Sequence, residues 1–161
     1  LLQDIIELHR QNKKINTFEL DLDDTVPLVR IDPAGIRQVL NNLVINAADA
    51  MAGIPSGRLT LRTHQATGSK DRSVTLEVRD TGPGFPQELL GSIFDPYVTT
   101  KTKGAGLGLA IARRIIEEQG GSIRAENDPA GGALVIIQLP VSLDTKPTGP
   151  LEGITNTASS H

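Results

Sequence analysis

The chain of 161 residues contains no cysteine and no tryptophan, and its aromatic residues are one tyrosine and three phenylalanines. A chain without cysteine forms no disulfide and no thiolate zinc site, which fits a reducing compartment. So few aromatic rings offer nucleic-acid bases little to stack on, and the net charge of −3 gives no excess of basic residues. We therefore expect an aliphatic core and no nucleic-acid partner.

Long apolar runs and targeting segments are also missing. No run approaches the roughly 20 residues that span a bilayer, and no signal peptide is visible. The length fits one compact domain with tails. The chain opens in the middle of an apolar pattern at Leu1, without a methionine, so we expect a fragment of a longer protein. We also expect this fragment to be soluble and cytoplasmic.

What the sequence does contain is a glycine-rich run, Gly104-Ala105-Gly106-Leu107-Gly108-Leu109, directly before a helical pattern from Ala110 to Gln119. Glycines at alternate positions let the backbone approach a ligand closely. The N-terminus of the helix directs unpaired N–H groups and a positive dipole at the loop. The run therefore predicts a phosphate-binding site, with a plain flexible loop as the alternative. It lacks the Lys-Ser/Thr pair of a Walker A loop and the third small residue of a dinucleotide fingerprint.

Hydrophobic periodicity and turn residues predict the other elements. Helices are expected over residues 1–12, from Pro33 to about Met51, and after Gly106, where Leu107, Ala110, Ile111 and Ile115 are predicted to be buried. Strands are expected at residues 17–22, 29–31, 59–63, 74–78, 122–126 and 133–139, with a turn at 68–71 joining the third and fourth as an antiparallel hairpin. The long segment from Asp80 to Lys103 has at most one short helix, near residues 87–92, and such a loop is usually functional or mobile.

One face of the helix that begins at Pro33 is polar. Asn42, Asn46 and Asp49 lie at positions i, i+4 and i+7, one above another. Asparagine is a poor helix former whose amide needs partners. We therefore interpret Asn46 as an oxygen ligand for Mg²⁺, with phosphate oxygens and waters completing the coordination shell. A solvated helix face is the alternative.

A second polar group, Asp80-Thr81-Gly82-Pro83-Gly84, follows directly on a predicted strand. The Asp80 carboxylate can accept a hydrogen bond from an exocyclic amine such as that of adenine. The two glycines allow a flat base to lie against the backbone. The alternative is an ordinary Asp-x-Gly turn that ends the strand.

Taken together, in this order and spacing, the three stretches resemble the catalytic ATP-binding domain of sensor histidine kinases, within the ATPase superfamily that includes gyrase, Hsp90 and MutL. Residues 38–50 (QVLNNLVINAADA) resemble the N box of this family, Asp80 to Phe85 its first glycine box, residues 93–97 (IFDPY) its F box, and Gly104 to Leu109 its second glycine box. The segment FDPYVTTK at 94–101 is most similar to nitrogen-regulation kinases of the NtrY/NtrB type.

The resemblance implies an α/β fold: a two-layer α/β sandwich of the Bergerat ATP-binding type. This fold has a mixed sheet of about five strands with three helices on one face, and here a long ATP lid between about Phe85 and Gly106. Residues 1–14 would be a linker helix from a missing upstream dimerisation and phosphoacceptor domain, and residues 15–141 the ATP-binding catalytic domain. Residues 142–161 are rich in Pro, Thr, Gly and Ser and would be a disordered C-terminal tail.

The resemblance also assigns roles to residues. Asn46 is the expected Mg²⁺ ligand, Asn42 its polar partner one turn earlier, and Lys101 a cation beside the triphosphate of ATP, so these three are the expected catalytic residues. Asp80 is expected to bind the adenine amine. The expected nucleotide-binding residues are Asn46, Asp49, Ala50, Asp80, Gly82, Gly84, Phe85, Thr100, Lys101, Lys103, Gly104, Ala105, Gly106, Leu107, Gly108 and Leu109.

Two positions depart from the family pattern. Asp49 stands where several members carry a basic residue that faces phosphate, so that contact must come from elsewhere or through Mg²⁺. Ala133 replaces a threonine often found in the last glycine motif, so a water-linked contact to adenine would be missing.

ATP-hydrolysing relatives place a glutamate one turn before the metal-binding asparagine, as a general base. This chain has Asn42 there. Because an amide cannot take up a proton at neutral pH, we expect transfer of the γ-phosphate to a histidine rather than hydrolysis. The alternative is a nucleotide-binding regulatory module or an anti-sigma-factor-type serine kinase of the same superfamily.

The implied partners are ATP and ADP, a histidine phosphoacceptor domain of the same parent chain, and a downstream response regulator. The parent is expected to be a homodimer, and segments not present here could anchor it in the inner membrane. His9 lacks the acidic residue and downstream proline expected around a phosphoacceptor. We therefore expect His9 to cap or pack the opening helix, and the fragment alone not to phosphorylate itself.

Overall fold

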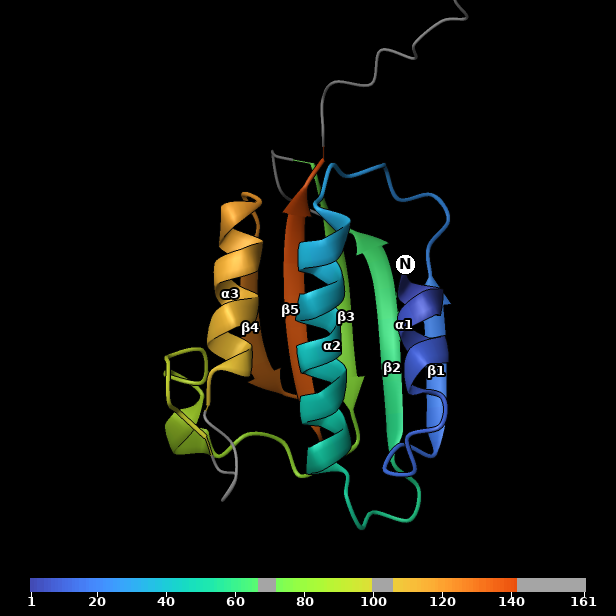
Figure 1. Cartoon of the computed structure of the whole chain (residues 1–161), viewed down its shortest axis with the longest axis vertical. Coiled ribbons are helices and arrows are strands. Elements are labelled where there is room, and N and C mark those ends of the chain that lie inside the picture. The colour runs from blue at the N-terminus through green and yellow to red at the C-terminus, as the bar shows by residue number, and fades with distance from the viewer. Residues whose placement is uncertain (67–71, 100–105, 142–161) are drawn as a thin grey trace, which may run out of the picture.

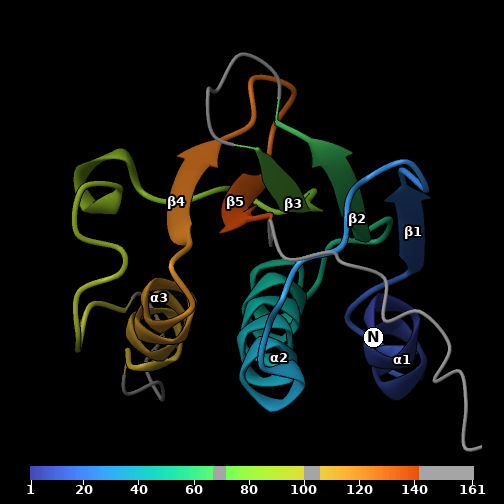
Figure 2. The same cartoon turned by 90° about the horizontal axis from the view of Figure 1, so that it is seen from above.

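The computed structural model describes residues 1–66, 72–99 and 106–141. In these ranges the chain forms one five-stranded sheet with three α-helices packed on one face (Figures 1 and 2). The helices are α1 (Leu2–His9), α2 (Pro33–Ala50) and α3 (Gly108–Glu118), with a short 3₁₀ helix, η1, at Gln87–Leu89. The strands are β1 (Thr17–Leu22), β2 (Arg58–Gln65), β3 (Ser73–Asp80), β4 (Ser122–Asn127) and β5 (Ala133–Pro140). None of the helices in these ranges is long and apolar enough to span a bilayer.

The sheet is mixed, with the strand order β1-β2-β3-β5-β4. β1 and β2 pair in parallel because α2 connects them as a crossover, whereas the other three neighbouring pairs are antiparallel. The predicted two-layer α/β sandwich and the predicted β2–β3 hairpin are confirmed. The turn predicted at 68–71 and the tail predicted at 142–161 lie outside the described residues.

The hydrophobic core lies between the sheet and the helices, with α2 over the centre of the sheet (Figure 2). The strand residues Leu59, Leu61 and Ile137 on the covered face are at most 1% exposed. Each buried aliphatic side chain of this kind contributes roughly 1.5–3 kcal/mol to folding. The side chains of α2 that are buried in this core are Ile36, Val39, Leu40, Leu43, Val44, Ala47 and Ala48.

The ends of α2 follow from local sequence. The Asp32 carboxylate accepts hydrogen bonds from two backbone N–H groups of the first turn, at 3.1 and 3.2 Å, and Pro33 occupies the first helical position. Gly53, with φ at 84°, lies just beyond the other end. The Asp32 N–H also donates to the side chain of Gln119 at the end of α3, at 2.9 Å, so the two helices are tied together here.

The strand predicted at Val29–Ile31 is wrong, because these residues form no strand. The side chains of Val29 and Ile31 pack against the core instead, and Asp32 directly after them must cap α2. The alternation of apolar residues therefore marks a segment that crosses over the core without pairing to a neighbouring strand.

The buried face of α3 also differs from the predicted one. Ala112 and Ile116 are fully buried, whereas Leu107 and Ile111 are 36% and 38% exposed, and the other two predicted residues are only partly buried. Apolar side chains occur on adjacent faces of this helix. Hydrophobic periodicity alone does not decide which of these faces packs on the sheet.

The other face of the sheet carries no helix in the described part of the chain (Figure 2) and bears charged side chains. Acid–base pairs join neighbouring strands: Arg58 lies 3.3 Å from Glu19, and Arg62 lies 3.1 Å from Asp21. Exposed pairs of this kind add little to stability. This face is therefore the solvated side of the sheet.

The turn between β4 and β5 packs directly on the end of β3. Gly131 and Gly132 both have positive φ, at 101° and 94°. A Cβ atom at Gly132 would overlap the carbonyl oxygen of Asp80, whereas one at Gly131 would meet nothing within 4 Å. Arg79 and Asp128 form an ion pair of 2.6 Å across the same junction. The turn thereby fixes the position of the last residue of β3.

Gly131→Ala and Gly132→Ala are a matched pair of substitutions that test this packing. Both place alanine at a positive φ, which costs roughly 1–2 kcal/mol. Only Gly132→Ala also forces the turn away from Asp80, which adds roughly 1–3 kcal/mol. In urea denaturation we expect Gly132→Ala to lose clearly more unfolding free energy than Gly131→Ala. Equal losses would contradict the close contact.

Candidate functional site

A pocket of about 510 Å³ opens between α2, the end of β3 with the segment that follows it, and the start of α3. Its volume lies in the usual range of small-molecule sites, about 300–1,000 Å³. Aliphatic walls surround a few polar groups. The lining residues are Leu43, Asn46, Ala47, Asp49, Ala50, Val78, Asp80, Pro83, Gly84, Phe85, Pro86, Ile93, Val98, Thr99, Gly106, Leu107, Gly108, Leu109, Ala133 and Val135.

The carboxylate of Asp80, at the end of β3, is a buried acid in the wall of this pocket and is 6% exposed. Its Oδ1 accepts hydrogen bonds from the backbone N–H groups of Gly82, at 2.8 Å, and Ala133, at 3.2 Å. Within the described residues both bonds go to Oδ1, so Oδ2 is the oxygen that can accept a hydrogen bond from a ligand. Burial raises the pKa of Asp80 above its usual value of 3.8, and the two N–H donors oppose this rise.

A side chain from β4 holds the part of the pocket wall that the segment after β3 forms. Asn127 accepts a hydrogen bond from the Phe85 N–H at 2.7 Å and donates one to the Phe85 carbonyl oxygen at 2.8 Å, as a neighbouring strand would. Gly84, with φ at 79°, lies so close that a Cβ atom there would be 2.6 Å from the Asn127 Oδ1. Asn127 therefore holds Gly84 and Phe85 in place. The sequence gives no signal for this role, because no motif connects position 127 to position 85.

The polar face of α2 serves two purposes. Asn46 and Asp49 line the pocket. Asn42, one turn earlier, does not line it: its Nδ2 donates to the carbonyl oxygen of Gly108 at 3.1 Å. Asn42 therefore ties α2 to the first turn of α3, and this contact positions that end of α3 at the pocket.

The N-terminus of α3 faces the pocket. Its N-cap residue is Leu107, and no side chain of the described residues caps this end of the helix. The Tyr97 N–H donates to the Gly106 carbonyl oxygen at 3.0 Å, and a Cβ atom at Gly106 would lie 2.7 Å from the Tyr97 carbonyl carbon. This tight backbone contact fixes the approach to α3. An anion in the pocket would meet the N–H groups and the positive end of the helix dipole.

Most of the residues predicted to bind nucleotide meet at this cavity. Gly82 is not in the lining but donates to Asp80 behind it, and Asn42 has the helix contact just described. Thr100, Lys101, Lys103, Gly104 and Ala105 lie outside the described residues. The predicted residues that line the pocket are Asn46, Asp49, Ala50, Asp80, Gly84, Phe85, Gly106, Leu107, Gly108 and Leu109.

The apolar walls are the part of the site that the sequence does not reveal. Leu43, Val78 and Val135 line the pocket, but their periodicity predicts only that they are buried. Which buried residues also face a cavity depends on how far α2 stands off the sheet. Ile93 and Val98 come from the long segment after β3, where the F box is a signal for Ile93 alone.

The arrangement favours one kind of ligand. The Asp80 carboxylate between apolar walls suits a flat ring with an exocyclic amine, and the N-terminus of α3 suits an anionic group. Asn46 adds a side-chain amide to the lining. The described ranges contain no group of three or more His, Cys, Asp or Glu side chains placed to hold a metal ion. A cation here would therefore need oxygen ligands from the bound molecule itself.

Known proteins are similar to this chain over most of its length. Residues 31–143 match the family described as histidine kinase-, DNA gyrase B-, and HSP90-like ATPase. The sensor histidine kinase TmoS of Ectopseudomonas mendocina is 37% identical over 74% of the chain, which spans 12% of TmoS. The sensory histidine kinase/phosphatase NtrB of Vibrio alginolyticus is 34% identical over 87% of the chain, which spans 41% of NtrB. The solved catalytic domain of histidine kinase ThkA is 34% identical, with a TM-score of 0.73 over 86% of this chain and 90% of that domain.

The buried acid predicts a pH dependence of stability. Because the folded-state pKa of Asp80 is raised above 3.8, its contribution to stability is fully present below pH 3.8 and is lost as the pH rises through the folded-state pKa. Asp80→Asn keeps an acceptor oxygen for Gly82 and Ala133 without the charge. By urea denaturation we expect this variant to be at least as stable as the parent at pH 7, with its advantage shrinking toward pH 4.

Asp21→Asn is the matched control for this measurement, because that carboxylate is 66% exposed on the helix-free face. Its stability should differ little from that of the parent at either pH. If Asp80→Asn instead lost more stability at pH 7 than at pH 4, the argument from burial would be wrong.

Proposed function

The chain belongs to the histidine kinase-, DNA gyrase B- and HSP90-like ATPase family, and we propose that it binds Mg·ATP in the pocket and passes the γ-phosphoryl group to a histidine. Its likeness to the ThkA catalytic domain, over 90% of that domain, makes it a protein-histidine kinase catalytic domain. The observation that carries the proposal is the convergence of Asp80, Asn46 and the N-terminus of α3 on one cavity.

The adenine ring fits the end of the pocket at Asp80. The exocyclic amine of adenine donates to Oδ2, because Oδ1 is already engaged by two backbone N–H groups. The apolar side chains of Val78 and Val135 and the backbone at Gly84 offer flat surfaces to the ring. An amine donor held by a buried carboxylate distinguishes adenine from a base that presents a carbonyl at the same position.

The triphosphate fits the N-terminus of α3, which has no side-chain cap within the described part of the chain. Mg²⁺ would be held by the Asn46 amide oxygen together with phosphate oxygens and waters, and it would offset the charge of the phosphates. Gly108 lines the pocket in the first turn of α3, and Asn42 holds that turn against α2. Lys101, Thr100, Lys103, Gly104 and Ala105 stay predictions for further contacts to the phosphates.

The chain's own residues favour transfer over hydrolysis. Asn42 stands where hydrolysing relatives place a general base, and its amide donates to a carbonyl oxygen instead of accepting a proton from water. In the proposed reaction the nucleophile is an imidazole nitrogen from another domain. It attacks the γ-phosphorus, the bond to the β,γ-bridging oxygen breaks, and ADP leaves with that oxygen.

The described histidines of this chain are engaged elsewhere. His9 on α1 lies 2.7 Å from the Asn41 side-chain oxygen on α2, as the expected packing role requires, and His64 lies 3.1 Å from Glu77 on the open face of the sheet. Neither lines the pocket. This supports a phosphoacceptor domain outside the fragment.

The wider assignments rest on the same proposal. Residues 1–14 link the ATP-binding domain, residues 15–141, to an upstream dimerisation and phosphoacceptor domain of the same parent, which is a cytoplasmic homodimer or one held at the inner membrane. ThkA, 31% identical in that comparison, has been solved in complex with the response regulator protein TrrA, which supports a response regulator as the downstream partner here. The similarity to TmoS and NtrB favours a histidine kinase over a serine kinase or a regulatory module.

Asp80→Asn tests the nucleotide site. The variant would present an amide N–H₂ to the adenine amine, so two donors would face each other. We expect the affinity for Mg·ATP and for ADP to fall about 10- to 100-fold, the equivalent of one buried hydrogen bond to a charged group, by isothermal titration calorimetry. Asp21→Asn, remote from the pocket, should bind as the parent does, and unchanged affinity in Asp80→Asn would rule out this site for adenine.

The proposed reaction is tested with γ-³²P-ATP. The chain alone should acquire no label, whereas addition of a phosphoacceptor-domain dimer from a similar sensor kinase should give phosphate that is labile in acid and stable in base, the behaviour of phosphohistidine. Acid-stable label on the added domain would indicate a serine kinase instead. Label on this chain alone would contradict the acceptor assignment.

A further inference from the structure

One side chain at the end of β4 holds the segment that follows β3, and the two run side by side in both views (Figures 1 and 2). Asn127, the last residue of β4, bonds to both the N–H and the carbonyl oxygen of Phe85, at 2.7 and 2.8 Å. No other described residue bonds to these two backbone groups. The position of this segment therefore depends on the Asn127 amide.

The same strand end also holds the acid of the pocket. Ala133 lies opposite Asn127 in the register of β4 and β5, and its N–H donates to the Asp80 carboxylate at 3.2 Å. Gly132, directly before Ala133, packs on the Asp80 carbonyl group, and its own carbonyl oxygen would lie 3.3 Å from a Cβ atom at Gly84. The junction of β4 and β5 therefore sets the position of Asp80 and of the wall beside it.

The wall that Asn127 holds is part of the pocket. Gly84, Phe85 and Pro86 are consecutive residues of its lining, and they belong to a segment without strand pairing in the described part of the chain. A backbone that is not held samples many conformations. It would have to be ordered when a ligand binds, which lowers affinity. Asn127 orders the wall before the ligand arrives.

We propose that Asn127 is a positioning residue of the nucleotide site: it holds the Gly84–Phe85 wall at the distance from Asp80 that an adenine ring requires. The proposal rests on the proposed function and deepens it, because it assigns the shape of the adenine end to a residue outside the N box and the glycine boxes. Asn127 is not part of the pocket lining and acts through the backbone of Phe85.

The proposal predicts which part of the nucleotide is affected. Asn127→Ala removes both bonds to Phe85, and the adenine ring is common to adenosine, Mg·ADP and Mg·ATP. We expect the affinity for all three to fall by the same factor, about threefold to tenfold. The ratio of the Mg·ATP and adenosine affinities should stay within about twofold of the parent's, because other side chains hold the ends of α3. Calorimetry measures the nucleotides, and an NMR titration measures adenosine.

Hydrogen exchange gives a local readout of the wall. Without ligand, we expect the Phe85 amide to exchange at least about tenfold faster in Asn127→Ala than in the parent, with the amides of β3 and β5 unchanged. Saturating Mg·ADP should slow this exchange again, because the bound ring orders the wall. A purely global loss of stability would instead speed the exchange of all core strand amides together.

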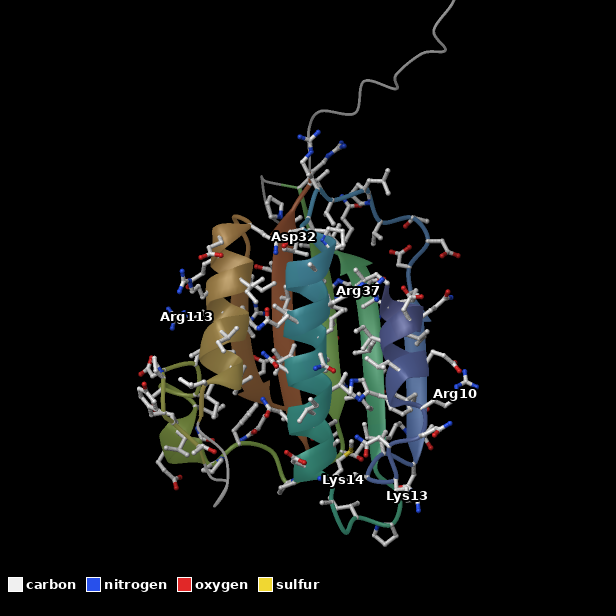
Figure 3. All side chains as sticks on the ribbon, in the orientation of Figure 1. Arg10, Lys13, Lys14, Asp32, Arg37 and Arg113 are labelled. Carbon is white, nitrogen blue, oxygen red and sulfur yellow. The ribbon has the colours of Figure 1, made fainter. Side chains whose placement is uncertain are left out.

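Asn16→Ala is the matched control, since the Asn16 side chain also accepts a backbone N–H, from Gly57 at 3.1 Å. Asn16 precedes β1, at the edge of the sheet opposite β4. Figure 3 shows Lys14, two residues earlier, near the C-terminal ends of α1 and α2 and not beside β4. This variant should bind all three ligands as the parent does.

Urea denaturation shows whether each variant is folded under the binding conditions. If Asn127→Ala is not, Asn127→Asp takes its place. It keeps the size of the side chain and the acceptor for the Phe85 N–H, but it presents an oxygen to the Phe85 carbonyl group in place of a donor. It should lose affinity in the same pattern.

Three results would overturn the proposal. Unchanged adenosine affinity in the Asn127 variant would mean that the wall needs no such support. An equal loss in Asn16→Ala would indicate a general effect of lost stability. A loss confined to Mg·ADP and Mg·ATP would place the effect at the phosphates. Failure of the proposed function is a separate result, because the parent chain itself would then bind neither Mg·ATP nor adenosine.

Discussion

The buried carboxylate of Asp80 is the constraint on which the site depends. An acid at 6% exposure is costly to bury unless donors meet it, and the N–H groups of Gly82 and Ala133 do so from two different strand ends. This forces the end of β3 and the start of β5 together. The glycines nearby follow from the crowding: Gly132 lies against the Asp80 carbonyl group, and Gly84 against Asn127. At Gly84 and Gly132 the chain is therefore packed so closely that no Cβ atom fits.

Helix α2 contributes side chains to both the hydrophobic core and the pocket. Its apolar stripe fills the space above the sheet, and its polar side turns Asn46 and Asp49 to the pocket. The Asn42 amide holds the first turn of α3, and Gln119 ties the far end of α3 to the start of α2. Because α3 is joined to α2 near both of its own ends, the distance between the N–H groups at the start of α3 and the polar face of α2 is fixed before a ligand arrives. This lowers the ordering cost of binding.

Sequence reasoning succeeds in this chain where the determinants are local. Asp32 and Pro33 start α2, and the N box and glycine boxes place Asn46 and Asp80 at one site because each is a short contiguous motif. It fails where tertiary contacts decide. The strand expected at Val29–Ile31 and the buried face expected for α3 both depended on apolar spacing that fits more than one arrangement. Asn127 acts on Phe85, which lies 42 positions away, and no local pattern marks such a partner.

The acid–base pairs on the open face also influence the register in which β1 pairs with β2. Within the described residues β1 is an edge strand that pairs with β2 alone, and Asp21 lies opposite Arg62 in the register. A shift of one residue along β2 would turn Glu19 and Asp21 toward the helices, and Phe18 out into water. The alternation of charged and apolar residues therefore makes the shifted register unfavourable, because charged side chains would be buried. Each ion pair nevertheless adds little stability to the correct register. The charged residues of β1 therefore disfavour an incorrect strand register while the sheet assembles.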